Sequence, residues 1–106
     1  MIKSVVLLKK RPDLTFEAFT DYWRNQHPQV VQQLPGLRRY VQSHIMQPIQ
    51  PQPAPFDGIG EAWFDDEAAL HAVRKSEAFA RLIADERNFL DTSVRTALLV
   101  REVAIR

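Results

Sequence analysis

Cysteine is absent from this 106-residue sequence, and that absence excludes several kinds of chemistry at once. Without thiols the chain can form no disulfide, thiolate nucleophile, iron–sulfur cluster or zinc–thiolate site. The three histidines lie far apart and lack the close spacing of a metal motif, so we expect no metal site. The sequence also has no glycine-rich phosphate loop and no nucleophile-elbow motif, so no nucleotide cofactor is predicted.

Long hydrophobic runs and a charge excess are missing as well. No apolar stretch approaches the ~18 residues that span a bilayer, and the N-terminus lacks the pattern of a signal peptide. The formal net charge of +1 indicates no basic surface for nucleic acid or for an acidic membrane. We therefore expect a cytoplasmic protein that binds neither nucleic acid nor membrane.

The composition that remains is that of a small globular protein. Hydrophobic residues make up 45% and charged residues 25% of the sequence, which is ordinary for a soluble domain. This length suits one core, so we expect residues 1–106 to form a single domain. A chain this short buries only ~65% of its unfolded surface, so association would add useful stability.

Hydrophobic periodicity predicts four strands with helices between them. The strands cover residues 2–9, 37–46, 58–64 and 94–105. The helices run from the Thr15 cap to residue 34, over residues 67–75, and from the Ser76 cap to residue 90. Segment 47–56 carries four prolines and is predicted to be an extended loop, either a passive connector or a rim that clasps a partner.

The order of these elements is strand, helix, strand, strand, helix, strand. That order predicts an α+β, ferredoxin-like βαββαβ fold, a four-stranded antiparallel sheet with helices on one face. The first and last strands are apolar on both of their faces, yet the helices cover only one. A monomer would therefore expose a large apolar patch, and we expect a homodimer whose sheets pack face to face as a dimeric α+β barrel.

One histidine, His27, stands out within the first predicted helix. Phe16, Phe19 and Trp23 recur at helical spacing, and His27 falls on the same inward stripe one turn later. Pro28 follows it and disturbs the helix at that point. A titratable ring on an inward face at a helix break is a candidate site; the alternative is a core histidine that donates to a carbonyl.

Three segments of the chain resemble the EthD-like family of the dimeric α+β barrel superfamily. They are FTDYWRNQHP at 19–28 with LPGLRRY at 34–40, FDGIGEAWF at 56–64, and ADERNFLD at 84–91. The resemblance implies a homodimer with a small apolar pocket between the helices and the sheet of each subunit. Similar domains include a methylmuconolactone isomerase and fungal dehydratase-like proteins, and other branches contain cofactor-free monooxygenases and haem enzymes, so the fold alone does not decide the reaction.

His27 matches the histidine of the family's first-helix motif and is our candidate general acid or base. It needs a partner to fix its tautomer, and Glu61, between two apolar neighbours on one strand face, is the preferred one. Glu61 could instead form a structural ion pair with an arginine at 38 or 39. Tyr40 is expected to assist at a substrate oxygen.

For the other polar residues we favour structural or surface roles. Asp57 precedes Gly58 at a strand start, which favours turn chemistry. Asp85 is a further candidate partner for His27, but a surface ion pair with Arg81 or Arg87 is the favoured interpretation. His71 is read as a surface residue of the second helix.

Aromatic and histidine side chains are the candidates for a pocket wall, although aromatic residues are more often core. The expected substrate-binding residues are Phe19, Trp23, His44, Trp63, Phe79 and Phe89. Gly58 and Gly60 share one strand face, which predicts that another group approaches closely there.

The sequence as a whole favours a small homodimeric enzyme that acts without a tightly bound cofactor. It would transfer a proton on a hydrophobic oxygenated catabolite, as an isomerase, dehydratase or oxygenase does. The alternative is a non-catalytic module that holds such a molecule for a partner oxygenase. A structural dimer whose pocket is filled by its own aromatic side chains is a third hypothesis.

Overall fold

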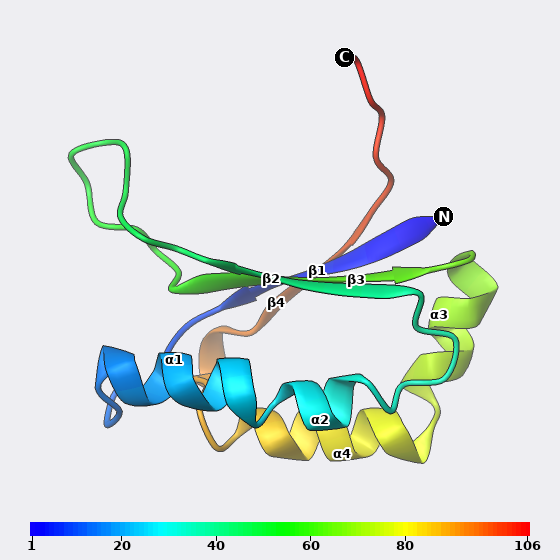
Figure 1. Ribbon diagram of the computed structural model, residues 1–106, viewed down its shortest axis with the longest axis horizontal. Coiled ribbons are helices and arrows are strands. Elements are labelled where there is room, and N and C mark those ends of the chain that lie inside the picture. Colours follow the sequence, from blue (N-terminus) through cyan, green and yellow to red (C-terminus); the bar gives the residue numbers. More distant parts are fainter.

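Four antiparallel strands form one sheet in the order β2-β3-β1-β4 in the computed structural model, which describes residues 1–106. The strands are β1 (Ile2–Leu8), β2 (Arg39–His44), β3 (Gly58–Phe64) and β4 (Thr96–Val100). The helices are α1 (Phe16–Asn25), α2 (Pro28–Val31), α3 (Glu67–Arg74), α4 (Glu77–Glu86) and the 3-10 turn η1 (Thr92–Val94). Helices α1, α2 and α4 lie on one side of the sheet and α3 lies at its end (Figure 1). This α+β ferredoxin-like arrangement confirms the predicted fold.

The ends of three strands differ from their predicted positions. β1 ends at Leu8 rather than at residue 9, and β2 covers 39–44 rather than 37–46. The last strand covers 96–100 rather than 94–105. Val94 belongs to η1, whose first turn is held by the Asp91 carboxylate. Residues 101–106 have no neighbouring strand to pair with, so their apolar alternation is left exposed.

Side-chain caps explain where the helices begin. Thr15 Oγ1 accepts a hydrogen bond from the Ala18 amide at 3.0 Å, and Asp66 and Ser76 cap α3 and α4 in the same way. The first predicted helix is divided, because α1 ends at Asn25 and Pro28 starts α2. The predicted irregularity at His27-Pro28 is therefore confirmed.

Two clusters of buried side chains pack between the sheet and the helices. One gathers at the β1 start, α2, α3 and α4, and the other joins β1, α1 and the segment after α4. The largest fully buried side chains are Trp23, Phe19, Phe64, Phe89 and Val73. Trp23 packs against the backbone of Gly58, where an added Cβ would lie 2.5 Å from its ring. The predicted close approach is confirmed at Gly58 and is wrong at Gly60, where an added Cβ would meet nothing within 4 Å.

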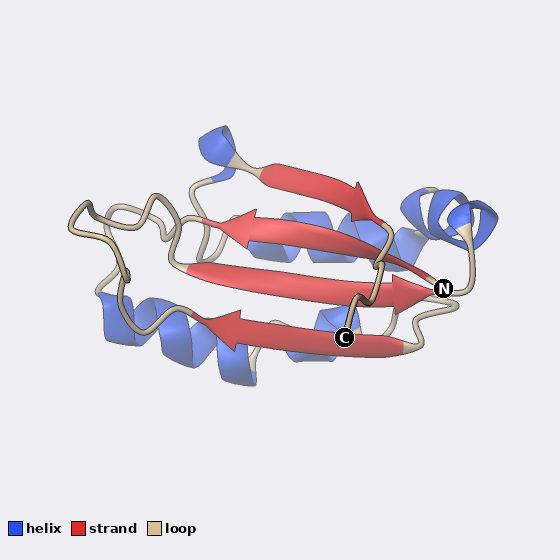
Figure 2. Cartoon of the chain, turned by 90° about the horizontal axis from the view of Figure 1, so that it is seen from above, coloured by secondary structure: helices blue, strands red, loops and turns tan.

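The opposite face of the sheet carries no helix, as Figure 2 shows from that side. We call it the open face. The residues whose side chains alternate onto it are Lys3, Val5, Leu7, Arg39, Val41, Ser43, Ile59, Glu61, Trp63, Thr96, Leu98 and Val100. The 47–56 loop and the C-terminal segment both project toward this side (Figure 1). None of the helices has the length and apolar character needed to cross a membrane.

Candidate functional site

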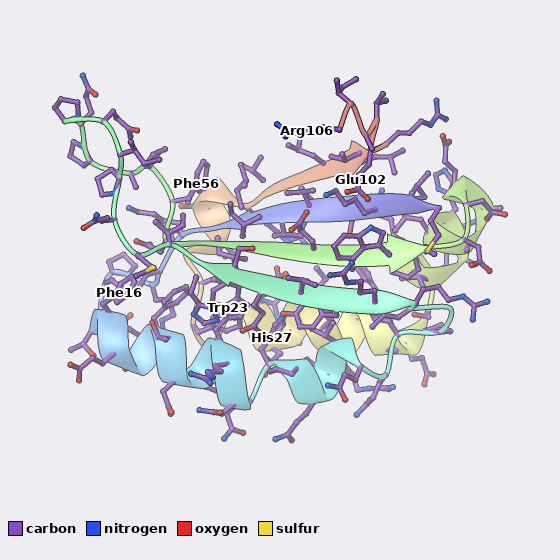
Figure 3. The ribbon with its side chains drawn as sticks, turned by 45° about the horizontal axis from the view of Figure 1, so that its top comes forward. Phe16, Trp23, His27, Phe56, Glu102 and Arg106 are labelled. Atoms are coloured by element: carbon purple, nitrogen blue, oxygen red, sulfur yellow. The ribbon has the colours of Figure 1, made fainter.

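His27 lies at the junction of α1 and α2, with its ring turned toward the interior. Its backbone amide donates to the Tyr22 carbonyl at 3.1 Å, and only 6% of the residue is exposed. The imidazole ring packs against Phe89, with 4.8 Å between ring centroids. Figure 3 shows Trp23 and His27 reaching from this segment toward the sheet. The helix break therefore directs a titratable ring into the fold.

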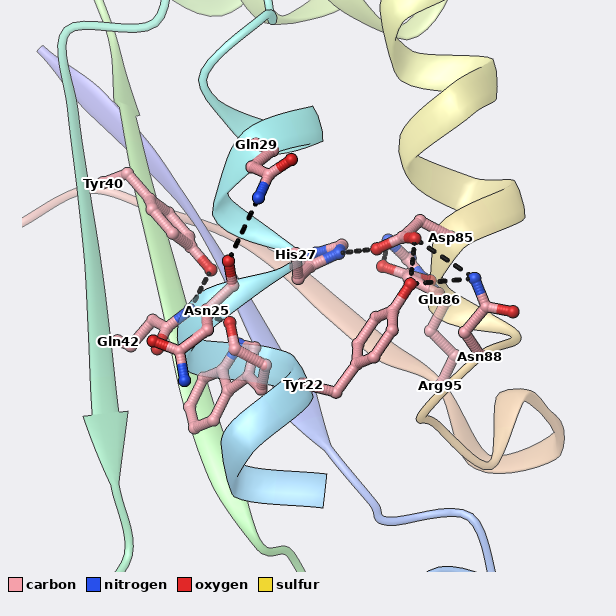
Figure 4. Close-up of polar contacts among 11 residues, drawn as sticks. Tyr22, Asn25, His27, Gln29, Tyr40, Gln42, Asp85, Glu86, Asn88 and Arg95 are labelled. Atoms are coloured by element: carbon pink, nitrogen blue, oxygen red, sulfur yellow. Dashed lines mark hydrogen bonds and ion pairs between the residues drawn. The ribbon is translucent and has the colours of Figure 1, made fainter. Parts of the chain in front are cut away.

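Asp85 is the partner that fixes the His27 ring. The Asp85 Oδ2 atom lies 2.7 Å from His27 Nδ1, and its Oδ1 accepts from the Tyr22 hydroxyl at 2.6 Å. Asn88 donates to the Tyr22 hydroxyl oxygen at 3.0 Å and to Asp85 Oδ1 at 3.2 Å. Figure 4 shows this network between α1 and the end of α4. The carboxylate is thus held from three directions.

The charge state of Asp85 decides which nitrogen of His27 carries a proton. Burial by itself would raise the pKa of Asp85, but hydrogen bonds from Tyr22, His27 and Asn88 outweigh it and hold that pKa below its usual value. Burial, reinforced by the bond to Asp85, raises the pKa of Tyr22, so the phenol remains a donor. An ionised carboxylate only accepts. Nδ1 must therefore donate, which leaves the lone pair of neutral His27 on Nε2.

A cavity of about 210 Å³ lies between the helices and the sheet, and His27 lines it. Fifteen of its 22 lining residues are hydrophobic. No side chain or backbone group of the chain hydrogen-bonds to His27 Nε2. Gly60 lines the cavity from the sheet, and a Cβ added there would meet nothing within 4 Å. The arrangement combines an unoccupied base with a small apolar space.

Tyr40 also lines this cavity, as expected for a residue that assists at a substrate oxygen. Its hydroxyl oxygen accepts from Gln42 Nε2 at 3.0 Å, and the same Gln42 nitrogen donates to the Trp23 carbonyl at 2.7 Å. Burial raises the pKa of Tyr40. The phenol therefore keeps its proton and can donate it to an oxygen in the cavity.

An ion pair between Glu86 and Arg95 also borders the cavity, and it was not predicted from the sequence. Glu86 is 3% exposed and accepts from Arg95 Nε at 2.7 Å and from Arg95 Nη2 at 3.2 Å. Both residues line the cavity. The helical spacing of Glu86 with apolar neighbours on α4 was the available signal, but nothing in the sequence connected it with Arg95.

The predicted contact between Glu61 and His27 is wrong. Glu61 points to the open face and forms an ion pair with Lys3 at 2.6 Å. The alternative pairing with Arg38 or Arg39 is also wrong. Arg38 binds Asp65 through two nitrogens at 3.0 and 2.9 Å, and the Arg39 guanidinium lies over the Trp63 ring. Glu61 borders the cavity, but its carboxylate is paired with Lys3 on the open face.

Trp63 also points to the open face, so the prediction that it lines the pocket is wrong. Its indole nitrogen donates to Glu102 at 3.1 Å. Lys3 Nζ lies 5.1 Å and the Arg39 guanidinium 4.8 Å from the ring centroid, within the range of cation–π attraction. Trp63 is a feature of the open face.

The other predicted pocket residues divide between wall and core. Trp23 and Phe79 line the cavity. Phe19 and Phe89 are instead completely buried, in the cluster that joins β1, α1 and the segment after α4. His44 is exposed, lies 4.3 Å from the Trp23 ring and approaches Gln42 Oε1 at 2.9 Å. Burial, and then the charge of Arg24, lower the pKa of His44.

The structure also tests the roles predicted for Asp57, His71 and Asp85. Asp57 accepts from the Lys10 amide at 2.8 Å, a local backbone role like the turn chemistry expected. His71 is exposed on α3, as predicted. The predicted ion pair of Asp85 with Arg81 or Arg87 is wrong, since Asp85 faces the network around His27.

The amino-acid sequence matches the family model of the EthD domain over residues 11–93. The chain belongs to the EthD domain family. Among curated proteins, none matches this chain.

Solved structures show how far the EthD fold of this chain is shared. An ethyl tert-butyl ether degradation (EthD) family protein from Bacillus halodurans is 21% identical with a TM-score of 0.79, covering 97% of this chain and 100% of that one. A dimeric ferredoxin-like protein of unknown function from Thermobifida fusca is 15% identical, with a TM-score of 0.69 over 95% and 90% of the chains. An antibiotic biosynthesis monooxygenase is 18% identical, with a TM-score of 0.62 over 98% and 100%. At these identities the likeness concerns the fold.

Proposed function

We propose that this EthD family protein binds a small hydrophobic oxygenated molecule in the cavity and transfers a proton on it through His27 Nε2. The observation that carries the proposal is the 2.7 Å contact between His27 Nδ1 and Asp85 beside an apolar cavity of about 210 Å³. A neutral imidazole with Nδ1 held as donor is a general base at Nε2. Asp85 takes the orienting role that the sequence had assigned to Glu61.

The lining of the cavity supports the substrate class. Mostly apolar walls with a few convergent polar groups are typical of small-molecule sites. Tyr40 supplies one such group, because its protonated hydroxyl can donate to a carbonyl or phenolic oxygen of the ligand. Proton removal from a C–H or O–H bond gives an enolate or phenolate, which is a common first step of isomerisation, dehydration and some oxygenations. This step uses protein groups alone, so the proposal requires no tightly bound cofactor.

The proposal also includes a homodimer. The open face carries apolar side chains without a covering layer, and Leu98 on it is 48% exposed. Two related structures are described as dimeric ferredoxin-like proteins. Packing two open faces together would bury this surface and complete an α+β barrel. Residues 1–106 are treated as one domain of that dimer, and a cytoplasmic location remains a prediction.

Proton transfer can be tested without knowing the natural substrate. The protein is incubated in D2O with small cyclic enones, lactones and phenols, and loss of C–H signals is followed by NMR. We expect wild type to exchange protons of at least one probe well above the buffer rate, and His27→Ala to lose this exchange. His71→Ala, which removes an exposed histidine from α3, is the matched control.

A second candidate function is a binding module that holds the ligand for a partner oxygenase. The same apolar cavity favours it, since binding alone needs no base. This alternative predicts chemical-shift changes on addition of the probes but no exchange, with only a modest change of affinity in His27→Ala. Exchange that is equal in wild type and His27→Ala would remove the catalytic assignment.

A further inference from the structure

Burial of the Glu86–Arg95 ion pair costs free energy of folding. Glu86 lies in the last turn of α4, where the helix dipole disfavours a negative charge. Its side chain is only 3% exposed, and burial of an ion pair often brings no net stability compared with apolar residues. Stability alone therefore gives a poor account of this pair. Its position on the cavity wall points to recognition of a ligand.

Glu86 holds the guanidinium of Arg95 in one orientation. The two hydrogen bonds use Nε at 2.7 Å and Nη2 at 3.2 Å, a bidentate geometry. The third nitrogen, Nη1, makes no hydrogen bond within the chain. The Arg95 side chain is 28% exposed and lines the cavity, which leaves Nη1 as the guanidinium nitrogen free to donate to a ligand. Arg95 is a donor whose direction is fixed in advance.

The His27–Asp85 pair and the Arg95–Glu86 pair meet at the end of α4. Asp85 and Glu86 are consecutive residues at the end of α4, and they hold His27 and Arg95 respectively. Figure 4 shows both carboxylates in the same turn. His27 and Arg95 line the same cavity. One turn of helix therefore positions a base and a cationic donor around one space.

We propose that Arg95 is the oxyanion-recognising residue of this cavity and that the ligand is an enolisable carbonyl compound. The inference rests on the proposed function and names the substrate class for it. His27 Nε2 takes the proton from the carbon beside the carbonyl: the C–H bond breaks and an N–H bond forms. The electron pair of the C–H bond forms a C=C bond to the carbonyl carbon, the π pair of the carbonyl moves onto its oxygen, and Arg95 Nη1 donates to the resulting enolate oxygen. Asp85 stabilises the imidazolium, and where the ligand carries a C=C bond next to the deprotonated carbon, return of the proton to the far carbon of the dienolate completes an isomerisation.

The neutral character of the pair favours a carbonyl compound over a carboxylate. Glu86 cancels the charge of Arg95 before a ligand arrives, so the pair offers one directed N–H donor and little net positive charge, which suits the delocalised charge of an enolate or phenolate better than the concentrated charge of a carboxylate. A carbonyl ligand is neutral when it enters the apolar cavity and acquires its negative charge only as the proton leaves. A fixed donor in such surroundings stabilises charge that develops at that moment.

Two probes of similar size test this assignment directly. 4-Nitrophenolate imitates an enolate oxygen, and 4-nitrotoluene has a methyl group in its place. Binding of each is measured by titration at a pH where the phenol is ionised, on wild type, Arg95→Gln and the double variant Glu86→Gln/Arg95→Gln. The double variant is included because Arg95→Gln alone leaves a buried charge unpaired. Arg81→Gln, on the exposed side of α4, is the control.

We expect both Arg95 variants to bind 4-nitrophenolate about 10-fold or more weakly, as loss of a charge-assisted hydrogen bond requires. Binding of 4-nitrotoluene should change less than about 2-fold, because no hydrogen bond to it is lost. Equal affinity of wild type and variants for the phenolate overturns the inference, and so does an equal loss of both probes. Wild type that binds neither probe contradicts the proposed function itself.

Discussion

His27 Nδ1 and Asp85 Oδ2 lie 2.7 Å apart, although the two residues are 58 positions apart in the chain. The contact joins the break between α1 and α2 to the last turn of α4. Because Asp85 is also hydrogen-bonded by Tyr22 and Asn88, its orientation does not depend on His27 alone. The site is therefore a preorganised dyad rather than an isolated histidine.

Replacement of Asp85 by Asn should slow proton transfer while leaving the cavity in place. The amide no longer forces Nδ1 to donate and no longer stabilises the imidazolium that forms as the proton is taken. We expect the exchange rate of the responsive probe to fall by about 10²- to 10⁴-fold, the contribution typical of general acid–base catalysis. Asp21→Asn, at an exposed carboxylate of α1, should leave the rate unchanged. A rate in Asp85→Asn equal to that of wild type would refute the orienting role.

The depressed pKa of Asp85 predicts how stability depends on acid. A carboxyl whose pKa is lower in the folded state contributes stability above its unfolded pKa, near 3.8, and loses it as pH falls through the folded value. The free energy of unfolding of wild type should exceed that of Asp85→Asn at pH 7, and the gap should narrow below pH 3.8. Urea unfolding at several pH values measures this gap. A gap that is constant with pH would contradict the prediction.

The two glycines of β3 should respond in opposite ways to the same substitution. Gly58→Ala places a Cβ 2.5 Å from Trp23, and overpacking of this kind costs about 1–3 kcal/mol. Gly60→Ala meets open space, and its φ is not positive, so reduced freedom of the unfolded chain should stabilise it by about 0.4–1 kcal/mol. Urea unfolding of both variants provides the comparison. Equal destabilisation would show that no cavity adjoins Gly60.

A larger side chain at Gly60 should block the cavity without touching the dyad. Gly60→Leu directs its side chain into the space lined by His27. We expect binding of 4-nitrotoluene to weaken by about 10-fold or more, since the ligand loses the apolar contact area it would bury. Unchanged binding in this variant would place the ligand site elsewhere.

Charge on the open face should prevent the proposed dimer. Leu98 lies opposite Val5 in the sheet register and is 48% exposed. Sedimentation velocity should report a dimer for wild type and a monomer for Leu98→Glu, because an unpaired carboxylate would be buried between the sheets. Ala80→Glu adds the same charge to the exposed side of α4 and should stay dimeric. A monomeric wild type at micromolar concentration would contradict the dimer.

The order of elements was predictable because it depends on local signals. Apolar periodicity marked each strand and helix, and Thr15, Asp66 and Ser76 lie at helix starts with their side chains as caps. The strand ends were not predictable in the same way. The pattern of residues 101–106 suits a strand, but pairing requires a neighbour that this chain does not place beside them.

The site was only partly predictable, and the reason is geometric. His27 could be found, since its stripe and Pro28 are local features. The face of Glu61 depends on strand parity, which residue types such as Ile59 and Trp63 leave open. The pairing of His27 with Asp85 depends on how α4 packs against α2, a contact between distant segments that no local pattern encodes.

The tautomer of His27 tests the central claim most directly. Nitrogen-15 NMR of the imidazole, recorded over a pH range that includes the neutral form, distinguishes a protonated Nδ1 from a protonated Nε2. The account predicts the Nδ1–H tautomer in wild type, with Nε2 as the unprotonated nitrogen whose signal shifts when 4-nitrophenol is added. A neutral ring protonated at Nε2 would contradict the account, because the lone pair would then point at Asp85 and not into the cavity.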